Sequence, residues 1–168
     1  IIKLKYPQFD LINTNFESNN NFSFNINNKF KVNNFEINSN ILLDSSKLKK
    51  NNLISKNLIK INDIIDLKDH KIKVTYSNKR LSIEGKGQIK LQDKFEIIDY
   101  QMSNKGSDLN LTSNLNLSEL NFKNQNLIKE YLPKTKDILS LKDQKIKINY
   151  KDNTISLEGS GKIKLQKE

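Results

Sequence analysis

The chain has 168 residues, of which 35% are hydrophobic and 29% charged, and it has no cysteine, so disulfides and thiolate metal sites are excluded. No apolar run approaches the ~20 residues of a membrane-spanning helix, and no signal peptide is visible. The mean hydropathy of −0.68 fits either disorder or sheets that are apolar on one face only. Regular alternation of apolar and polar residues favours the sheets.

The net charge is +10, and it comes almost wholly from lysine, since Arg80 is the only arginine. Such a surface suits nucleic acid, anionic lipid headgroups or lipopolysaccharide. Lysines also solvate the outer face of exposed strands and block edge-to-edge pairing, which is the interpretation we favour. We expect no nucleic-acid binding, because an arginine cluster and aromatics interleaved with the basic positions are both missing.

Taken in chain order, alternating stretches predict strands before and between the two best-defined hairpins. These stretches are Phe22/Phe24/Ile26, Phe30/Val32, Phe35/Ile37, Ile41/Leu43, Leu109/Leu111 and Leu115/Leu117. Around 95–102 the alternation slips by one residue, which indicates a bulge. A short helical segment is expected at 127–132, where Leu127, Ile128, Tyr131 and Leu132 recur at helical spacing before Pro133, and its counterpart is 52–59.

Two hairpins are predicted in the same register. About Asn78-Lys79, alternation pairs Tyr76 with Leu81, Val74 with Ile83 and Ile72 with Gly85. About Asp152-Asn153, it pairs Tyr150 with Ile155, Ile148 with Leu157 and Ile146 with Gly159. Asp and Asn suit two-residue loops because their side chains tolerate positive φ. All six pairs then lie on one apolar face.

These hairpins belong to an internal repeat. Residues 67–91 and 141–165 align without a gap at an offset of 74 (141 − 67). The chain therefore divides into 1–34, the end of a preceding unit, 35–108, the first full unit, and 109–168, a truncated second unit, in one continuous array. We expect it to be an excerpt from a longer protein. Linear arrays usually present one long surface rather than a single catalytic pocket.

Each unit has an E-G-x-G motif, with glycines at Gly85/Gly87 and Gly159/Gly161. Neither a third glycine nor a helix follows, so this is not a phosphate loop. Glycines in the middle of a strand mark a bend, a bulge or the close approach of another group. They could shape a groove for a bulky ligand or let a strongly curved sheet bend, and we favour curvature.

Residues suited to catalysis or metal binding are few. His70 is the only histidine and aligns with Gln144, so we expect a solvated turn residue rather than a base. Glu84 and Glu158 recur on the polar face beside lysines, where surface pairing explains them better than acid–base chemistry. A calcium loop at Asp66 and Asp69 is not supported, because the second unit does not repeat it. We expect no enzyme, no metal site and no cofactor.

The stretch from Tyr131 to Gln166 resembles the repeats of the AsmA-like envelope lipid-transport proteins, the AsmA/TamB/YhdP superfamily. The shared features are the Leu132-Pro133 step, the strand from Ile146 to Tyr150, the G-x-G before the next strand and the alternating strands beyond. The resemblance covers about 35–168. It implies a periplasm-spanning protein, anchored to the inner membrane by a segment outside this sequence, whose groove of antiparallel strands carries phospholipid toward the outer membrane. It implies no catalytic residues.

The predicted fold is all-β: an elongated, repetitive antiparallel sheet curled into an open groove, with one short helical segment per repeat. The predicted function is bridge-like transfer of phospholipid or another acyl-chain lipid between the inner and outer membranes, with membrane contact through parts of the chain not present. The alternative is a structural or adhesive β-repeat stalk without a ligand. The expected groove residues are Ile72, Val74, Tyr76, Leu81, Ile83, Ile89, Leu91, Ile146, Ile148, Tyr150, Ile155, Leu157, Ile163 and Leu165.

Overall fold

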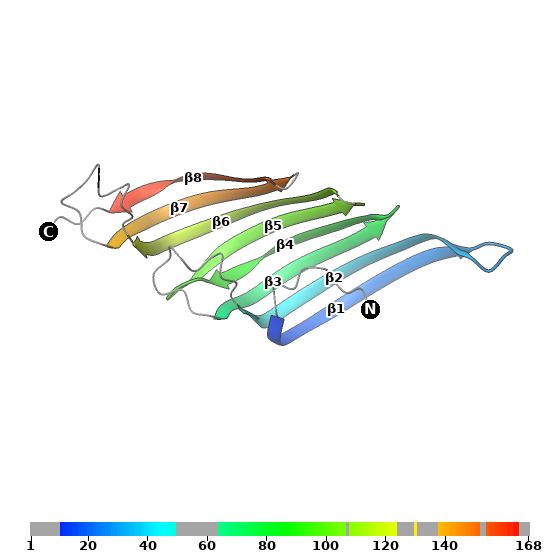
Figure 1. Ribbon diagram of the computed structural model, residues 1–168. Helices are drawn as coiled ribbons and strands as arrows, with labels where there is room; N and C mark the ends of the chain where they lie inside the picture. The colour runs from blue at the N-terminus through cyan, green and yellow to red at the C-terminus, as the bar shows by residue number, and fades with distance from the viewer. Residues whose placement is uncertain are drawn as a thin grey trace.

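The computed structural model describes residues 11–49, 64–106, 108–123, 130, 138–151 and 154–164. The strands form one antiparallel sheet in which each is hydrogen-bonded to the next along the chain (Figure 1). They are β1 (Leu11–Ile26), β2 (Val32–Lys49), β3 (Ile64–Ser77), β4 (Arg80–Lys90), β5 (Phe95–Lys105), β6 (Asp108–Lys123), β7 (Ile138–Lys151) and β8 (Thr154–Lys164). The predicted all-β antiparallel fold is confirmed. The expected helical residues Leu127, Ile128, Tyr131 and Leu132 and the segment 52–59 lie outside the described residues.

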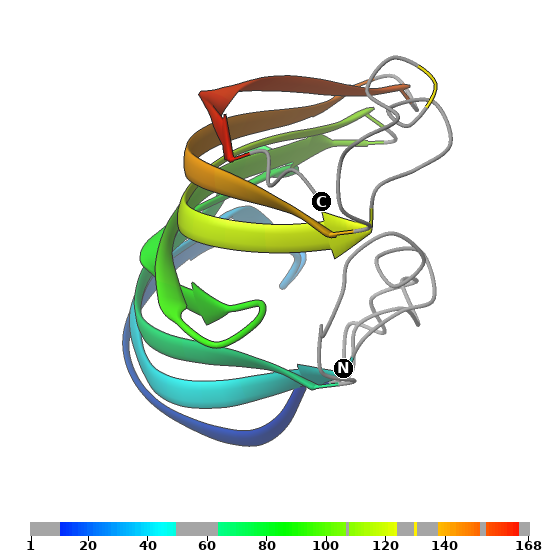
Figure 2. The ribbon, with the colours of Figure 1, turned by 90° about the vertical axis from the view of Figure 1, so that its left-hand side faces the viewer.

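The sheet is open, with β1 and β8 as its two edges. Its strands bend along their length, so that the sheet is C-shaped when viewed from the side and the strands stack along a shared concave face (Figure 2). Alternation along each strand sends one set of side chains to this concave face and the other set to the convex outer face. The buried side chains, among them Leu43, Leu115 and Leu117, belong to the apolar set, and a bent sheet covers the side chains on its inner side, so the apolar set lies on the concave side.

Both predicted hairpin registers are confirmed. β3 and β4 pair Tyr76 with Leu81 and Val74 with Ile83. β7 and β8 repeat this pairing 74 residues later, including Tyr150 with Ile155. Asn78 and Lys79 form the first two-residue loop with φ of 50° and 60°. Positive φ at both positions gives the loop a twist that matches its flanking strands. The loop residues Asp152 and Asn153 lie outside the described residues.

Each repeat contains a β-bulge opposite the second glycine of its E-G-x-G motif. In β3, Asp69 and His70 stand opposite Gly87 alone, and in β7 Asp143 and Gln144 stand opposite Gly161. Asp69 and Asp143 adopt φ of 53° and 51°, a left-handed conformation that aspartate tolerates. A bulge bends its strand and increases the local twist. The curvature expected at the glycines therefore has a defined cause in the partner strand.

Two local predictions are wrong. β5 pairs residue for residue with β4, from Phe95 to Lys105, so it has no bulge at 95–102. The apparent slip arises because Phe95 and Ile97 lie on the outer face, where they are 43% and 47% exposed. Phe30 is not part of a strand. It lies in the turn between β1 and β2 with φ of 54°, and its N–H donates to the Asn27 carbonyl.

The buried apolar side chains gather around the bulges and on the side of the bulges away from the hairpin loops. There Leu115, Leu117 and Leu120 form a cluster against which Ile89, Leu91, Ile98, Leu141 and Ile146 pack. Ile65 and Leu139, equivalent in the two repeats, are 2% and 1% exposed. Toward the hairpin loops the concave face is only half-buried. One wall of the curved sheet is thus better packed than the other.

Candidate functional site: the concave apolar face

The two repeats contribute to one continuous row of side chains on the concave face. Cross-strand neighbours follow one another from β3 to β8 without a gap in the row. In order, they are Val74, Ile83, Met102, Leu111, Tyr150 and Ile155. We call this set the apolar row. Directly opposed side chains in an antiparallel sheet lie about 5 Å apart and touch. The apolar row is therefore a single contiguous surface that crosses six strands.

A second row runs beside it and is less uniform. From β2 to β8 it comprises Ile41, Ile72, Gly85, Tyr100, Ser113, Ile148 and Leu157. Neither row contains a charged residue. Together they give the concave face a charge-free surface along the whole stack of strands from β3 to β8.

Most of the predicted groove residues lie on this face, in different environments. Those of β3, β4 and β7 are half-buried. On the edge strand, Ile155, Leu157 and Ile163 are 65%, 68% and 58% exposed. Ile89 and Leu91 pack against the buried cluster of β6 instead of lining the open part. Leu165 lies outside the described residues.

Several residues of the concave face were missed because the prediction used only the best-repeating segments. Met102 and Leu111 join the two repeats in the apolar row. Tyr100 bridges them in the second row. Their signal was present in the sequence: all three belong to alternating stretches, and the repeat alignment places Ile37 onto Leu111.

His70 is a buried structural residue, and the prediction of a solvated turn residue is wrong. It is 3% exposed, and its ring covers Gly87, where an added Cβ would overlap it. Its Nε2 lies 2.9 Å from the carbonyl oxygen of Gln88. Because a carbonyl only accepts, Nε2 carries the proton. Nδ1 then accepts from the Tyr100 hydroxyl, 3.4 Å away.

Gln144 has the same structural role in the second repeat as His70 has in the first. It is 8% exposed, and its side-chain amide covers Gly161. Its Nε2 donates to the carbonyl oxygen of Lys162 at 3.0 Å, the equivalent of the bond from His70 to Gln88. What the two side chains share is an N–H that donates to the carbonyl of the residue after the second glycine, which explains why histidine and glutamine can alternate there.

Burial sets the protonation of this cluster. Desolvation lowers the pKa of His70, and the hydrogen bond with Gln88 and the charge of Asp69 only partly oppose it. Desolvation also raises the pKa of Tyr100. Both side chains are therefore neutral near pH 7, and the floor of the concave face carries no charge at this point.

The glycines do not form an open row of notches for a ligand. At Gly85 an added Cβ would overlap the ring of Tyr100, so this position is filled by protein, as are Gly87 and Gly161. Of the four glycines in the two motifs, only Gly159 is open, with Lys145 O the nearest atom at 3.9 Å from a Cβ placed there. Glycine serves mainly to admit large side chains of the neighbouring strands.

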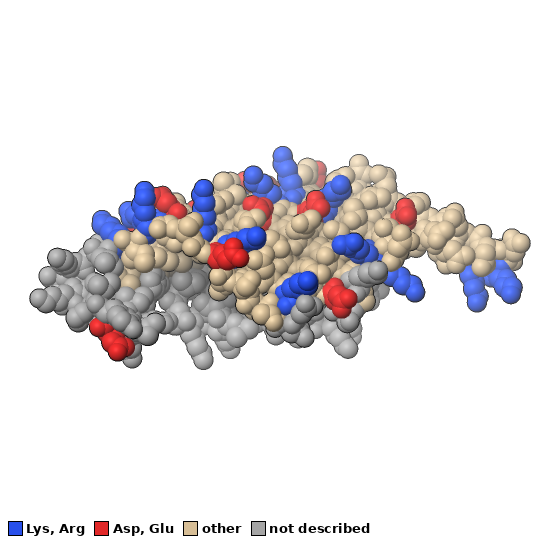
Figure 3. Space-filling model, turned by 90° about the horizontal axis from the view of Figure 1, so that it is seen from above, with Lys and Arg blue, Asp and Glu red and all other residues tan. Residues whose placement is uncertain are grey.

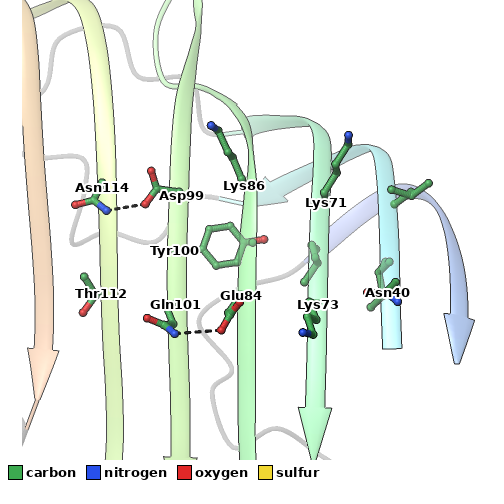
Figure 4. Close-up of a pocket in the computed structure, with 14 residues that line it drawn as sticks. Asn40, Lys71, Lys73, Glu84, Lys86, Asp99, Tyr100, Gln101, Thr112 and Asn114 are labelled. Carbon is green, nitrogen blue, oxygen red and sulfur yellow. Dashed lines mark hydrogen bonds between the residues drawn. The ribbon is translucent and has the colours of Figure 1, made fainter. Parts of the chain in front are cut away.

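The outer face is polar and contains a shallow, open hollow of about 630 Å³ (Figure 4). Lys71, Lys73 and Lys86 extend around it. The carboxylates are paired with amides of the next strand. Gln101 donates to Glu84 at 3.2 Å, and Asn114 donates to Asp99 at 2.6 Å.

The second repeat has an equivalent hollow, which includes Lys145, Lys147 and Glu158. The prediction that Glu84 and Glu158 lie on the polar face beside lysines is confirmed, since they pair with Lys73 and Lys147. Lysines and acidic residues project from the upper edge of the molecule in Figure 3 and are also scattered over the rest of the visible face. The lysines and carboxylates around the two hollows are thus kept on the outer face, whereas Glu96, opposite Ile89 and 9% exposed, lies on the concave side of β5 outside the apolar row.

No known protein family, curated protein or solved structure matches the chain. Among the described residues, no helix is long and apolar enough to cross a membrane. No group of three or more His, Cys, Asp or Glu side chains in the described ranges is placed to hold a metal ion.

Proposed function

We propose that the concave face binds the acyl chains of phospholipid, or of another acyl-chain lipid, and that the array is a segment of a bridge-like lipid-transfer protein. The observation that carries this proposal is the apolar row, a contiguous surface across six strands that remains partly exposed. Soluble proteins rarely leave such a continuous apolar surface exposed without a partner.

The dimensions suit acyl chains. Eight strands at a spacing of about 4.8 Å give a stack about 34 Å long. One acyl chain spans about half of a hydrocarbon core about 30 Å thick, so about 15 Å. Each methylene removed from water contributes about 0.8 kcal/mol when fully covered. The sheet can hold a tail along its stack without any specific contact.

The repeated environment supports movement as well as binding. Val74 and Ile83 of the first repeat have Ile148 and Leu157 as their equivalents in the second. A tail that shifts along the stack exchanges similar apolar neighbours for one another. Because the apolar row contains no charged residue, a tail meets no ionic barrier along it. Small differences between successive positions are what sliding requires.

The proposal extends to location. In the AsmA-like proteins that the sequence resembles, a groove of this kind connects the inner and outer membranes across the periplasm. We place the proposed transfer there, with an inner-membrane anchor in a segment outside this sequence. The proposed role requires no catalytic step and no cofactor.

The test is site-specific photocrosslinking. A photoreactive amino acid at Ile83 or Ile148, on the concave face, is expected to form adducts with lipid that copurifies from an envelope fraction. The neighbouring positions Ser82 and Asn149 point to the outer face and provide matched controls. Adducts at none of the four positions, with no lipid in the purified protein, would rule out the conduit and favour the β-repeat stalk.

A further inference from the structure

We propose that the hairpin of β1 and β2 is a membrane-docking element, whose tip enters the surface of a bilayer that contains anionic lipid. The two strands are joined by a turn at residues 27–31, since Ile26 is the last residue of β1 to pair and Val32 is its partner. We call residues 24–35 the hairpin tip. This membrane contact is separate from acyl-chain binding on the concave face.

The hairpin tip projects beyond the rest of the sheet (Figure 1). Ile37 is the first residue of β2 that pairs with β3, opposite Tyr76. No strand pairs with residues 32–36 on that side, because β3 turns back into β4 at Asn78 and Lys79. The tip is therefore uncovered on the side where the neighbouring strands are fully described.

The free edge of β1 is not the cause of this exposure. Asn20 of β1 and Tyr100 of β5 pair with equivalent serines of the two repeats, so β1 corresponds to β5. β4 begins opposite Lys105, five residues after Tyr100. A strand of the β4 type beside β1 would accordingly begin near Asn25, and it would leave the turn and the start of β2 uncovered.

The hairpin tip carries a dense set of exposed apolar side chains. Phe30, in the turn, is 89% exposed and is the most exposed large apolar side chain among the described residues. Val32 and Phe35 of β2 are 56% and 40% exposed, and Phe24 and Ile26 of β1 are 48% and 59% exposed. A contiguous apolar patch of this kind marks a site of interaction with a membrane or another molecule.

The backbone of the turn is hydrogen-bonded within the turn itself. The side-chain oxygen of Asn27 accepts from the N–H of Lys29 at 2.9 Å and from that of Lys31 at 3.0 Å. The Asn27 carbonyl accepts from the N–H of Phe30 at 2.9 Å, and the Asn27 N–H donates to the Lys31 carbonyl at 3.0 Å. A turn that satisfies these donors internally can leave water for the bilayer interface without the cost of unpaired N–H groups.

Phe30 is held in a conformation that phenylalanine rarely adopts. Its φ of 54° lies in the left-handed region, which glycine and asparagine occupy at much lower cost. The side chain that results is exposed, so its packing does not explain why the residue is a phenylalanine. A strained residue without a packing role indicates a functional one.

The charges of the hairpin tip favour a membrane over a protein partner. Lys29 and Lys31 flank Phe30, and the chain has no acidic residue between Glu17 and Glu36. The visible charged side chains at this projecting end are basic (Figure 3). Lysine is attracted to anionic headgroups. It is depleted in protein interfaces, where Tyr, Trp, Met and Arg are enriched, and the hairpin tip contains none of these four.

Insertion is tested with a fluorescent reporter in the whole 168-residue protein. The chain has no tryptophan, so Phe30→Trp introduces a single one. With vesicles of phosphatidylcholine and phosphatidylglycerol, we expect its emission to shift to the blue and to be quenched by brominated lipid. The matched control is Lys79→Trp, in the neighbouring turn with a similar φ of 60°, which should show neither change.

Affinity is measured by sedimentation of the protein with the same vesicles. Phe30→Gly should weaken binding about tenfold or more, because the interface loses a phenylalanine side chain. Its Tm should equal or exceed that of the parent, since glycine adopts positive φ without strain. Lys29→Gln combined with Lys31→Gln should weaken binding about fivefold per lysine, and only when the vesicles contain phosphatidylglycerol.

Four results overturn the proposal: no binding of the parent to vesicles, equal binding by Phe30→Gly, equal emission changes at positions 30 and 79, or a loss of vesicle binding in Ile148→Asp as large as in Phe30→Gly. The last result would assign vesicle binding to the concave face. Self-association that Phe30→Gly removes, detected by size-exclusion chromatography in the absence of vesicles, would assign the hairpin tip to a contact between copies of the chain and would overturn the proposal too.

Discussion

The two E-G-x-G motifs place the same substitution in two different environments. In Gly85→Ala the new Cβ overlaps the ring of Tyr100, which must move from its half-buried position. Overpacking of this kind costs about 1–3 kcal/mol of folding stability. In Gly159→Ala the new methyl group has no neighbour nearer than Lys145 O at 3.9 Å. Alanine restricts the unfolded chain more than glycine does, so this change should stabilise the protein by about 0.4–1 kcal/mol.

The assay is urea unfolding followed by far-ultraviolet circular dichroism, with thermal melts in parallel. For a chain of this length each kcal/mol corresponds to about 2–4 °C in Tm, so the two variants should move in opposite directions by measurable amounts. The clash with Tyr100 is checked in a double-mutant cycle. In a Tyr100→Ala background, the penalty of Gly85→Ala should disappear. Equal effects of the two alanines, or a penalty that survives without the tyrosine, would refute the proposed packing.

Three further predictions concern the bulges and the apolar face. Exchanging the bulge residues by His70→Gln or Gln144→His should change stability little. His70→Ala should cost about 1–3 kcal/mol in urea unfolding, because the part-buried carbonyl of Gln88 loses its donor. Since burial lowers the pKa of folded His70 below its ordinary 6.5, the unfolded chain takes up the proton first as the pH falls. The free energy of unfolding should therefore decline as the pH falls below about 6.5, until the pH passes the lowered pKa of folded His70. The measurement compares urea unfolding at pH 7.5 with unfolding at pH 5.5. His70→Gln should remove the part of the decline that comes from His70. Ile148→Asp should abolish lipid copurification with little change in Tm. The control Asn149→Asp adds the same charge on the outer face and should change neither lipid copurification nor Tm. A large loss of Tm in Ile148→Asp would mean that this position belongs to a closed core.

Hairpin register was predictable because it depends on local information. Between Val74 and Ile83 only a short chain and a two-residue loop intervene, and period-two alternation fixes which residues share a face. The repeat then supplied an independent second instance. The order of all eight strands follows from the same locality, since each strand pairs with its neighbours in sequence.

The bulges were not predictable from alternation alone. Around 95–102 a change of phase marked apolar residues on the outer face of a regular strand, and Phe95 there lies beneath the ammonium group of Lys90, 5.8 Å from the ring centroid. At His70 a bulge was present, but an isolated histidine between charged residues has the composition of a turn. Alternation records where apolar side chains point, whereas a bulge depends on a mismatch between two strands that one strand does not reveal.

The role of the glycines could be identified only once the positions of three neighbouring strands, β3, β4 and β5, were known together. The position of Gly85 is filled by β5 and that of Gly87 by β3. Sequence reasoning identified the close approach of another group as one use of such glycines, and it could not identify the group. The histidine and tyrosine that fill these positions lie 30 residues apart in the chain and meet only through the sheet.

The strand before each bulged strand changes the phase of its side-chain alternation at the same place as the bulge. This change links the bend of the sheet to its apolar lining. A bulge adds one residue, so beyond it the side chains of that strand would otherwise fall out of phase with its neighbour. In β2 the alternation changes phase together with that of β3. Leu43 pairs with His70 and Ser46 with Leu67, so successive pairs on the concave face are three residues apart in both strands instead of two. In the second repeat Leu117 pairs with Gln144 and Leu120 with Leu141.

Because the shift is shared, Leu117 and Leu120 join one buried cluster although the bend lies between them. Both walls of the curved sheet therefore keep apolar side chains on the concave side. A bulge in β3 or β7 alone would have turned one wall polar. The repetition of the paired shift in two units, whose sequences differ at the bulge itself, indicates that a concave face with two apolar walls is the property these repeats maintain.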